Sequence, residues 1–155
     1  MGAYYQFKVS ALNFNGESLA SEPLSVHACV APGPATGLRR VTGDSTSITL
    51  AWEAPADDGG CPLTGYQLMR DGGGGISDPI ATEVDAAAVN SRPALTQHLV
   101  TLSSAETGKP LRFQLITHNA EASTASAVSQ FIIAGLPGKP PAPVTYRHLE
   151  APYVN

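Results

Sequence analysis

One stretch of the sequence occurs twice, and the distance between its copies limits what a chain of 155 residues can contain. Residues 5–13 read YQFKVSALN and residues 111–119 read LRFQLITHN, an offset of 106 (119 − 13). Pro32-Gly33 likewise returns as Pro137-Gly138, an offset of 105 (137 − 32). Because a repeat of this length fits only once into the chain, the sequence predicts the end of one unit, one whole unit and the start of a third.

Proline marks the boundaries between these units. Residues 31–34 read APGP and residues 136–143 read LPGKPPAP. Since proline fixes φ and removes a backbone donor, these segments are stiff connectors rather than strand interiors. We therefore divide the chain into the C-terminal hairpin of a preceding unit (1–31), a complete unit (32–135), and a linker with the first strand of a following unit (136–155). The 15 glycines and 13 prolines also argue against a helical bundle.

Within the complete unit, apolar and polar residues alternate with the period of β-strands, and turn segments such as DDGG at 57–60 separate the runs. Short strands at this spacing predict an all-β fold of two antiparallel sheets packed face to face. The Ala-rich segment 84–89 is short and lacks caps, so we predict a loop or irregular edge there, and a last strand at 127–133. The predicted core consists of large apolar residues on the inner faces: Ile48, Leu50, Trp52, Tyr66, Leu68, Leu111, Phe113 and Leu115.

The order of these motifs resembles the fibronectin type III domain, an immunoglobulin-like antiparallel β-sandwich. An alternating strand that contains Trp52, the loop DDGGCPLTGY at 57–66 and then Asn119 follow one another as is typical of that family. Residues 3–29 resemble the last two strands of a preceding copy, and 140–155 resemble the first strand of a following one. In this family a tyrosine usually ties the corner before the sixth strand. Leu111 stands at that place, so packing alone is expected to hold this corner.

Composition and motifs argue against several classes of function. The net charge is −4 with no basic cluster, so nucleic acid is not an expected partner. No apolar run approaches the roughly 18 residues that membrane insertion requires. The four histidines are scattered without metal-ligand spacing, and neither Gly-x-Ser-x-Gly nor His-Glu-x-x-His occurs. We therefore expect no enzyme activity, no cofactor and no metal, and at Asp57-Asp58 a turn is favoured over a weak calcium site.

The two cysteines leave one question open. Cys29 ends the first hairpin, and Cys61 lies in the loop that follows the Trp52 strand. The resemblance places both near the junction between the first two units, where a disulfide would fix the angle between them. The alternative is a pair of free or buried thiols, which is the favoured interpretation because two cysteines do not make a disulfide framework.

The resemblance implies a structural or protein-interaction module that spaces and orients its neighbours within a larger multidomain assembly. The expected partners are other protein domains or chains, including neighbouring copies of the same fold. A cytoskeletal or ciliary setting inside the cell is favoured, and an accessory domain of a secreted enzyme or an extracellular adhesion protein is the alternative. Candidate partner contacts lie in three loops: Asp57, Asp58, Gly59, Gly60 and Cys61 in the first, Gly72 and Gly73 in the glycine-rich second, and Glu121 and Ser123 in the third.

The first 31 residues carry only two strands of their unit. Tyr5, Phe7 and Val9 would face a core to which this sequence contributes no further strands. Because an isolated hairpin is marginal in water, we expect this apolar face to be completed by a neighbouring part of a tandem array or by another chain.

Overall fold

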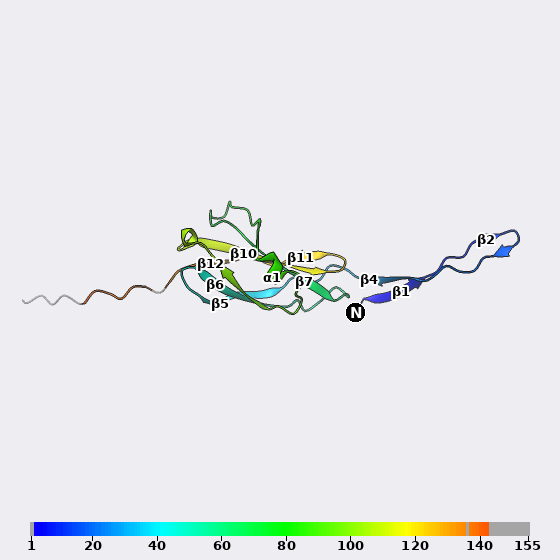
Figure 1. The fold of residues 1–155 in the computed structure, drawn as a ribbon, viewed down its shortest axis with the longest axis horizontal. Helices are drawn as coiled ribbons and strands as arrows, with labels where there is room; N and C mark the ends of the chain where they lie inside the picture. The colour runs from blue at the N-terminus through cyan, green and yellow to red at the C-terminus, as the bar shows by residue number, and fades with distance from the viewer. Residues whose placement is uncertain (1, 136, 143–155) are drawn as a thin grey trace, which may run out of the picture.

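The computed structural model describes residues 2–135 and 137–142 and is built almost entirely of antiparallel strands. Figure 1 shows a sandwich of two sheets in the middle of a long molecule, with a narrow hairpin extending from one end. Residues 137–142 leave the sandwich at the opposite end without forming a strand. Within the described ranges, no helix is long and apolar enough to cross a membrane.

The first sheet of the sandwich has three strands in the order β5-β6-β9. These are β5 (Thr36–Gly43), β6 (Ser47–Glu53) and β9 (Gln97–Thr101), all antiparallel to their neighbours. Large apolar residues occupy every second position of β6, so its Ile48, Leu50 and Trp52 side chains share the inner face.

The second sheet is centred on β10 (Pro110–Asn119), which pairs with β7 (Leu63–Arg70) on one side. β8 (Thr82–Val84) extends the sheet beyond β7. On its other side β10 pairs with two short strands, β11 (Ser123–Ala125) and β12 (Ser129–Ile132). The last strand predicted at 127–133 is confirmed as β12, whereas β11 is a short strand that the sequence did not predict, separated from β12 by a break. The break falls at Ser126, whose backbone N–H donates to the Leu115 carbonyl and whose hydroxyl accepts from the Leu115 N–H.

The core lies between the two sheets and contains every apolar residue predicted for it. Trp52 from the first sheet meets Tyr66 from the second edge-on, with ring centroids 5.7 Å apart. Alternation along β10 buries Leu111, Phe113 and Leu115 completely. Fully burying side chains of this size contributes about 1.5–3 kcal/mol each, so this layer is the main source of stability.

Segment 84–89 departs from the predicted loop. Ala86–Val89 form one turn of helix, α1, packed against β7. Val89 is completely buried, and its packing explains why a segment without a side-chain cap is helical.

The corner before β10 is not held by packing alone, as the missing tyrosine suggested. A short 3-10 turn, η1 (Ser104–Glu106), closes it. The Glu106 carboxylate accepts hydrogen bonds from the Ser103 N–H (2.8 Å) and hydroxyl (2.9 Å), and it pairs with Arg70. Thr107 Oγ1 donates to the Ser45 carbonyl at 2.6 Å. Polar contacts thus replace the tyrosine hydroxyl, while Leu111 packs in the core.

The N-terminal hairpin has its own small sheets. β1 (Ala3–Phe7) pairs with β4 (Leu24–Ala28), and further out β2 (Leu12–Asn13) pairs with β3 (Gly16–Glu17). The β1–β4 register places Tyr5 opposite Val26 and Phe7 opposite Leu24, so one face is wholly apolar. That face is about half exposed, with Tyr5 at 50% and Phe7 at 56%.

The predicted start of a following unit at 136–155 is described only over 137–142, and its remaining residues lie outside the described part of the structure.

Candidate functional site

The loop between β6 and β7 forms the junction between sandwich and hairpin. The segment that leaves β4 runs beside this loop: Val30 N–H donates to the Gly59 carbonyl (2.9 Å) and Gly33 N–H to the Asp57 carbonyl (2.8 Å). At the other end of the hairpin, Gly2 N–H donates to the Gly60 carbonyl at 2.6 Å. Both ends of the hairpin are therefore attached to the same loop.

Gly59 is required at the centre of this contact. Its φ of +74° is one that side chains rarely adopt, and a Cβ there would meet the Val30 carbonyl oxygen and lie 2.8 Å from that of Ala31. The two preceding acidic side chains shape the turn: Asp57 Oδ1 accepts from Gly59 N–H (2.9 Å) and Asp58 Oδ1 from Gly60 N–H (2.8 Å). Both carboxylates thus cap backbone groups, as turn-forming aspartates do.

Asn119, at the end of β10, joins three segments at the same junction. Its Nδ2 donates to the Val30 carbonyl (2.7 Å) and to the Asp58 carbonyl (2.9 Å). Its Oδ1 accepts from the N–H groups of Glu121 and Ala122. The sequence singled out Asn119 only as part of a motif. The signal for its role was the equivalent Asn13, whose Oδ1 accepts from the Asn15 N–H in the hairpin.

Cys29 and Cys61 are joined by a disulfide across this junction. Their Cα atoms lie 5.6 Å apart, within the range that a disulfide requires. The structure therefore has the bonded pair rather than the free thiols that the sequence favoured. Cys61 is buried and Cys29 is partly exposed.

The glycine-rich loop of Gly72 and Gly73 lies at the opposite end of the sandwich, next to Lys109 and Leu111 at the start of β10. The Asp78 carboxylate accepts from the N–H groups of Gly72 (2.7 Å) and Gly74 (3.0 Å). The exit of the chain also lies at this end, because the Gly108 N–H donates to the Ile133 carbonyl.

Asp71 anchors the base of that loop from a fully buried position. Its Oδ2 accepts from Arg112 Nε (2.6 Å), and its Oδ1 accepts from the N–H groups of Arg112 and Gly73. Burial by itself would raise the pKa of this carboxyl, but the hydrogen bonds and charge of Arg112 outweigh it and lower the pKa. The carboxylate is therefore ionised and paired at neutral pH.

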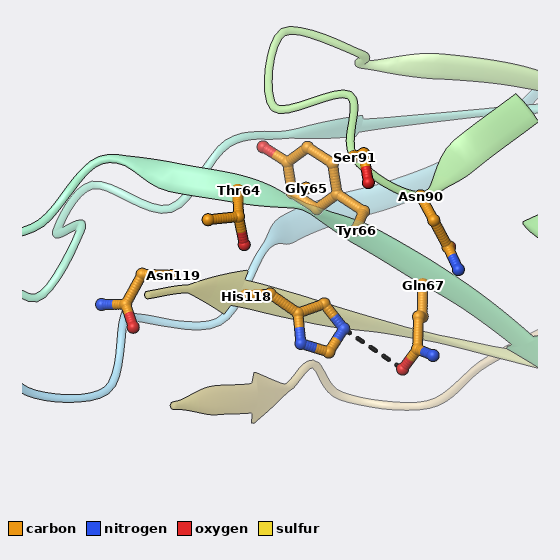
Figure 2. Close-up of a pocket in the computed structure, with 8 residues that line it drawn as sticks. All are labelled: Thr64, Gly65, Tyr66, Gln67, Asn90, Ser91, His118 and Asn119. Atoms are coloured by element: carbon orange, nitrogen blue, oxygen red, sulfur yellow. Dashed lines mark hydrogen bonds between the residues drawn. The ribbon is translucent and has the colours of Figure 1, made fainter. Parts of the chain in front are cut away.

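The third candidate loop borders a shallow polar cavity of about 250 Å³ on the outer face of β7 and β10 (Figure 2). Glu121 is exposed and does not line the cavity, whereas Ser123 Oγ lies 2.8 Å from Nδ1 of His118, which does. His118 Nε2 faces Gln67 Oε1 at 3.1 Å, and Gln67 in turn donates to Glu83. Because the group behind His118 is a neutral amide, the Ser123–His118 pair lacks the carboxylate that activates a nucleophile in a catalytic triad.

The described residues contain no group of three or more histidine, cysteine or acidic side chains arranged to hold a metal ion. The best-organised set of contacts is thus the junction, which combines a disulfide, backbone hydrogen bonds and the Asn119 amide. It can fix the position of the preceding segment, whereas the cavity around His118 is lined by this histidine and by uncharged polar residues without a carboxylate.

Comparisons with known proteins found similarity by sequence and by structure. No family model matches the chain. The chain is 39% identical over 69 residues to the striated-muscle M-protein of Gallus gallus, 39% over 70 residues to the netrin receptor DCC of Rattus norvegicus, and 41% over 67 residues to neogenin of Homo sapiens. These matches cover 41%, 43% and 41% of this chain but only 5%, 5% and 4% of those proteins.

Two solved structures share the architecture. A crystal structure of titin domains superimposes with a TM-score of 0.60 at 19% identity, over 86% of this chain and 41% of that one. A crystal structure of the FN1-FN3 domains of chicken CNTN1 gives a TM-score of 0.55 at 16% identity, over 86% and 43%. Together with the order of the strands and the core built around Trp52, these likenesses show that the chain contains a domain of the fibronectin type III fold.

Proposed function

We propose that the chain is a non-catalytic spacer module that holds a preceding unit at a fixed orientation. The observation that carries this proposal is the junction, where the loop of Asp57–Cys61 is bound by both ends of the hairpin through hydrogen bonds and by a disulfide. The loop predicted to contact an outside partner is thereby assigned to the neighbouring unit of the same chain.

The arrangement of the two ends supports a rod-like role. The hairpin is attached at one end of the sandwich, and residues 137–142 leave from the other (Figure 1). In this arrangement the sandwich separates the preceding and following segments by its own length, and a pulling force would act along its sheets. The loops of Gly72 and Glu121 remain candidate contacts for other proteins.

Residual dipolar couplings of backbone amides test the fixed orientation. We expect one alignment tensor to fit the amides of β1, β4 and the sandwich together. Gly59→Val places a side chain against the Val30 and Ala31 carbonyls and should require two tensors. Gly138→Val, where no atom lies within 4 Å of the added Cβ, is the matched control and should leave one tensor. Two tensors in the unaltered chain would overturn the proposal.

The hairpin is, in this proposal, the last part of a preceding unit. Its apolar face corresponds to the β10 face that the first sheet covers in the complete unit, with Tyr5, Phe7 and Val9 in the places of Leu111, Phe113 and Leu115. A sheet of the same construction would therefore cover it.

The disulfide favours the extracellular setting as a second candidate. Disulfides persist in oxidising compartments and are rare in the cytosol, and Cys29 and Cys61 are bonded. The netrin receptor DCC and neogenin are in keeping with this extracellular alternative, whereas the striated-muscle M-protein is in keeping with the intracellular one. Alkylation of free thiols in the native parent protein, before and after reduction, separates the two: an extracellular protein should show both cysteines protected.

A further inference from the structure

We propose that the Cys29–Cys61 bond is a redox-controlled lock on the orientation of the preceding unit. When the bond is present the hairpin is fixed on the sandwich, and when it is reduced the junction becomes a hinge. This inference rests on the junction of the proposed function and adds a way to release it.

The contacts that remain after reduction are hydrogen bonds, without a covalent link across the junction. Val30 is 66% exposed and both Gly2 and Gly60 are partly exposed, so water can reach the hydrogen bonds at the edge of the junction; the buried Asn119 amide still donates to the Val30 carbonyl. A hydrogen bond that water can replace contributes little net stability. The disulfide is the only covalent link between the described hairpin and sandwich apart from the chain itself, and it joins residues 32 apart in sequence.

The rest of the sandwich does not depend on this bond. Cys61 packs at the margin of the core, outside the cluster formed by Trp52, Tyr66 and their neighbours. The strands on either side, β6 and β7, are held by their own pairing with β9 and β10. Loss of the bond should therefore loosen the junction and leave the domain folded.

The two cysteines differ in exposure, and this difference decides which of them a reductant reaches first. Cys61 is 3% exposed, whereas Cys29 is partly exposed. The thiolate of an external dithiol would attack Sγ of Cys29, forming a mixed disulfide and releasing the Cys61 thiolate, which takes up a proton. The second thiol of the dithiol then attacks the mixed disulfide and frees Cys29. In balance, two thiols of the reductant become one disulfide while the protein disulfide becomes two thiols.

Amide hydrogen exchange on the full chain, oxidised and then reduced with dithiothreitol, tests the lock. The reporters are the Val30 and Gly33 amides, which donate across the junction, and the reference is the Trp52 amide, which donates to the Thr96 carbonyl inside the sandwich. On reduction we expect exchange at the reporters to accelerate about tenfold or more while exchange at Trp52 stays unchanged, as in local opening. Cys29→Ser with Cys61→Ser should reproduce the reduced state without reductant.

The remaining outcomes each overturn the proposal. Unchanged exchange at Val30 and Gly33 would mean that hydrogen bonds alone fix the junction, so the lock fails while the spacer function survives. Faster exchange at Trp52 as well would mean that the disulfide stabilises the whole domain and not the junction alone. Two alignment tensors already present in the oxidised chain would remove the spacer function, and the lock with it.

Discussion

At the scale of single residues, the interior contains polar atoms without partners. Tyr66 and Thr117 sit side by side in the register of β7 and β10, and Trp52 packs on Tyr66. Trp52 Nε1, Tyr66 OH and Thr117 Oγ1 are buried and have no hydrogen-bond partner among the described residues. Burial also raises the pKa of Tyr66, so its hydroxyl is neutral at any ordinary pH.

Thr117→Val is therefore expected to stabilise the domain. It removes a hydroxyl buried without a partner and keeps the shape, which should gain about 1 kcal/mol in the free energy of unfolding by urea. Thr101→Val, at an exposed position of β9, is the control and should change stability by less than about 0.5 kcal/mol. A loss of stability in Thr117→Val would mean that the hydroxyl is bonded, for example to a buried water.

Gly65 is the second residue whose identity the packing dictates. A Cβ there would lie 2.6 Å from the Ser91 N and 3.0 Å from the Arg92 N, so β7 approaches the segment after α1 as closely as backbone can. We expect Gly65→Ala to destabilise the domain by about 2 kcal/mol through this overpacking. The urea midpoint of Gly138→Ala, where the added Cβ meets nothing within 4 Å, should stay unchanged. An unaltered midpoint in Gly65→Ala would show that the two segments separate freely.

At the scale of elements, the corner closed by η1 links stability to pH. Burial opposes ionisation of Glu106, but hydrogen bonds and charge from Arg70 and hydrogen bonds from Ser103 outweigh it and lower the pKa below its usual 4.5. The unfolded chain then takes up the proton first as the pH falls. The stabilisation is complete above about pH 4.5 and is lost as the pH drops through the folded-state pKa.

Glu106→Gln should therefore destabilise the domain at pH 7 and cost progressively less towards pH 3. We expect a loss of about 2 kcal/mol at pH 7, which is typical of a hydrogen-bonded charge. Urea unfolding of both proteins at several pH values measures the difference, and the exposed Glu121→Gln is the control. A difference that grows on acidification would have the wrong sign for a lowered pKa.

Sequence patterns predict the sheets better than the contacts that join them. Alternation placed Trp52 and Phe113 in the core because strand burial is a local, two-residue property. The break between β11 and β12 at Ser126 and the helical turn at Val89 depend on tertiary packing. A local sequence period does not predict such packing. The corner was predictable in part, since Ser103 and Glu106 have the Ser-x-x-Glu spacing of a capping box.

The sequence predicted where the junction lies but not the contacts that hold it. The resemblance located Cys29 and Cys61 near one another, but the bond itself depends on a Cα separation that sequence does not give. The Asn119 amide reaches backbone carbonyls 61 and 89 residues away, and such side-chain contacts leave no periodic trace. The hydrogen bonds from the glycine-rich loop to the Asp78 carboxylate were equally unpredictable, because composition does not show them.

At the scale of the whole molecule, the two faces of the hairpin differ sharply. Tyr5 and Val26 lie on the apolar face, and the cross-strand pair Tyr4 and His27 lies on the other. An exposed apolar face on a two-stranded sheet invites association. We therefore expect the 155-residue chain to self-associate as its concentration rises.

Light scattering with size-exclusion chromatography measures that association, and paired variants locate it. Tyr5→Ser with Val26→Ser removes apolar surface from one face and should shift the chain towards monomer. Tyr4→Ser with His27→Ser alters the same two strands on the opposite face and should leave the association unchanged. Since the sandwich is held by its own core, neither pair should move its urea midpoint. If both pairs dissociate the chain equally, strand edges rather than the apolar face drive association. A monomer at every concentration would mean that the apolar face is stable in water without a cover.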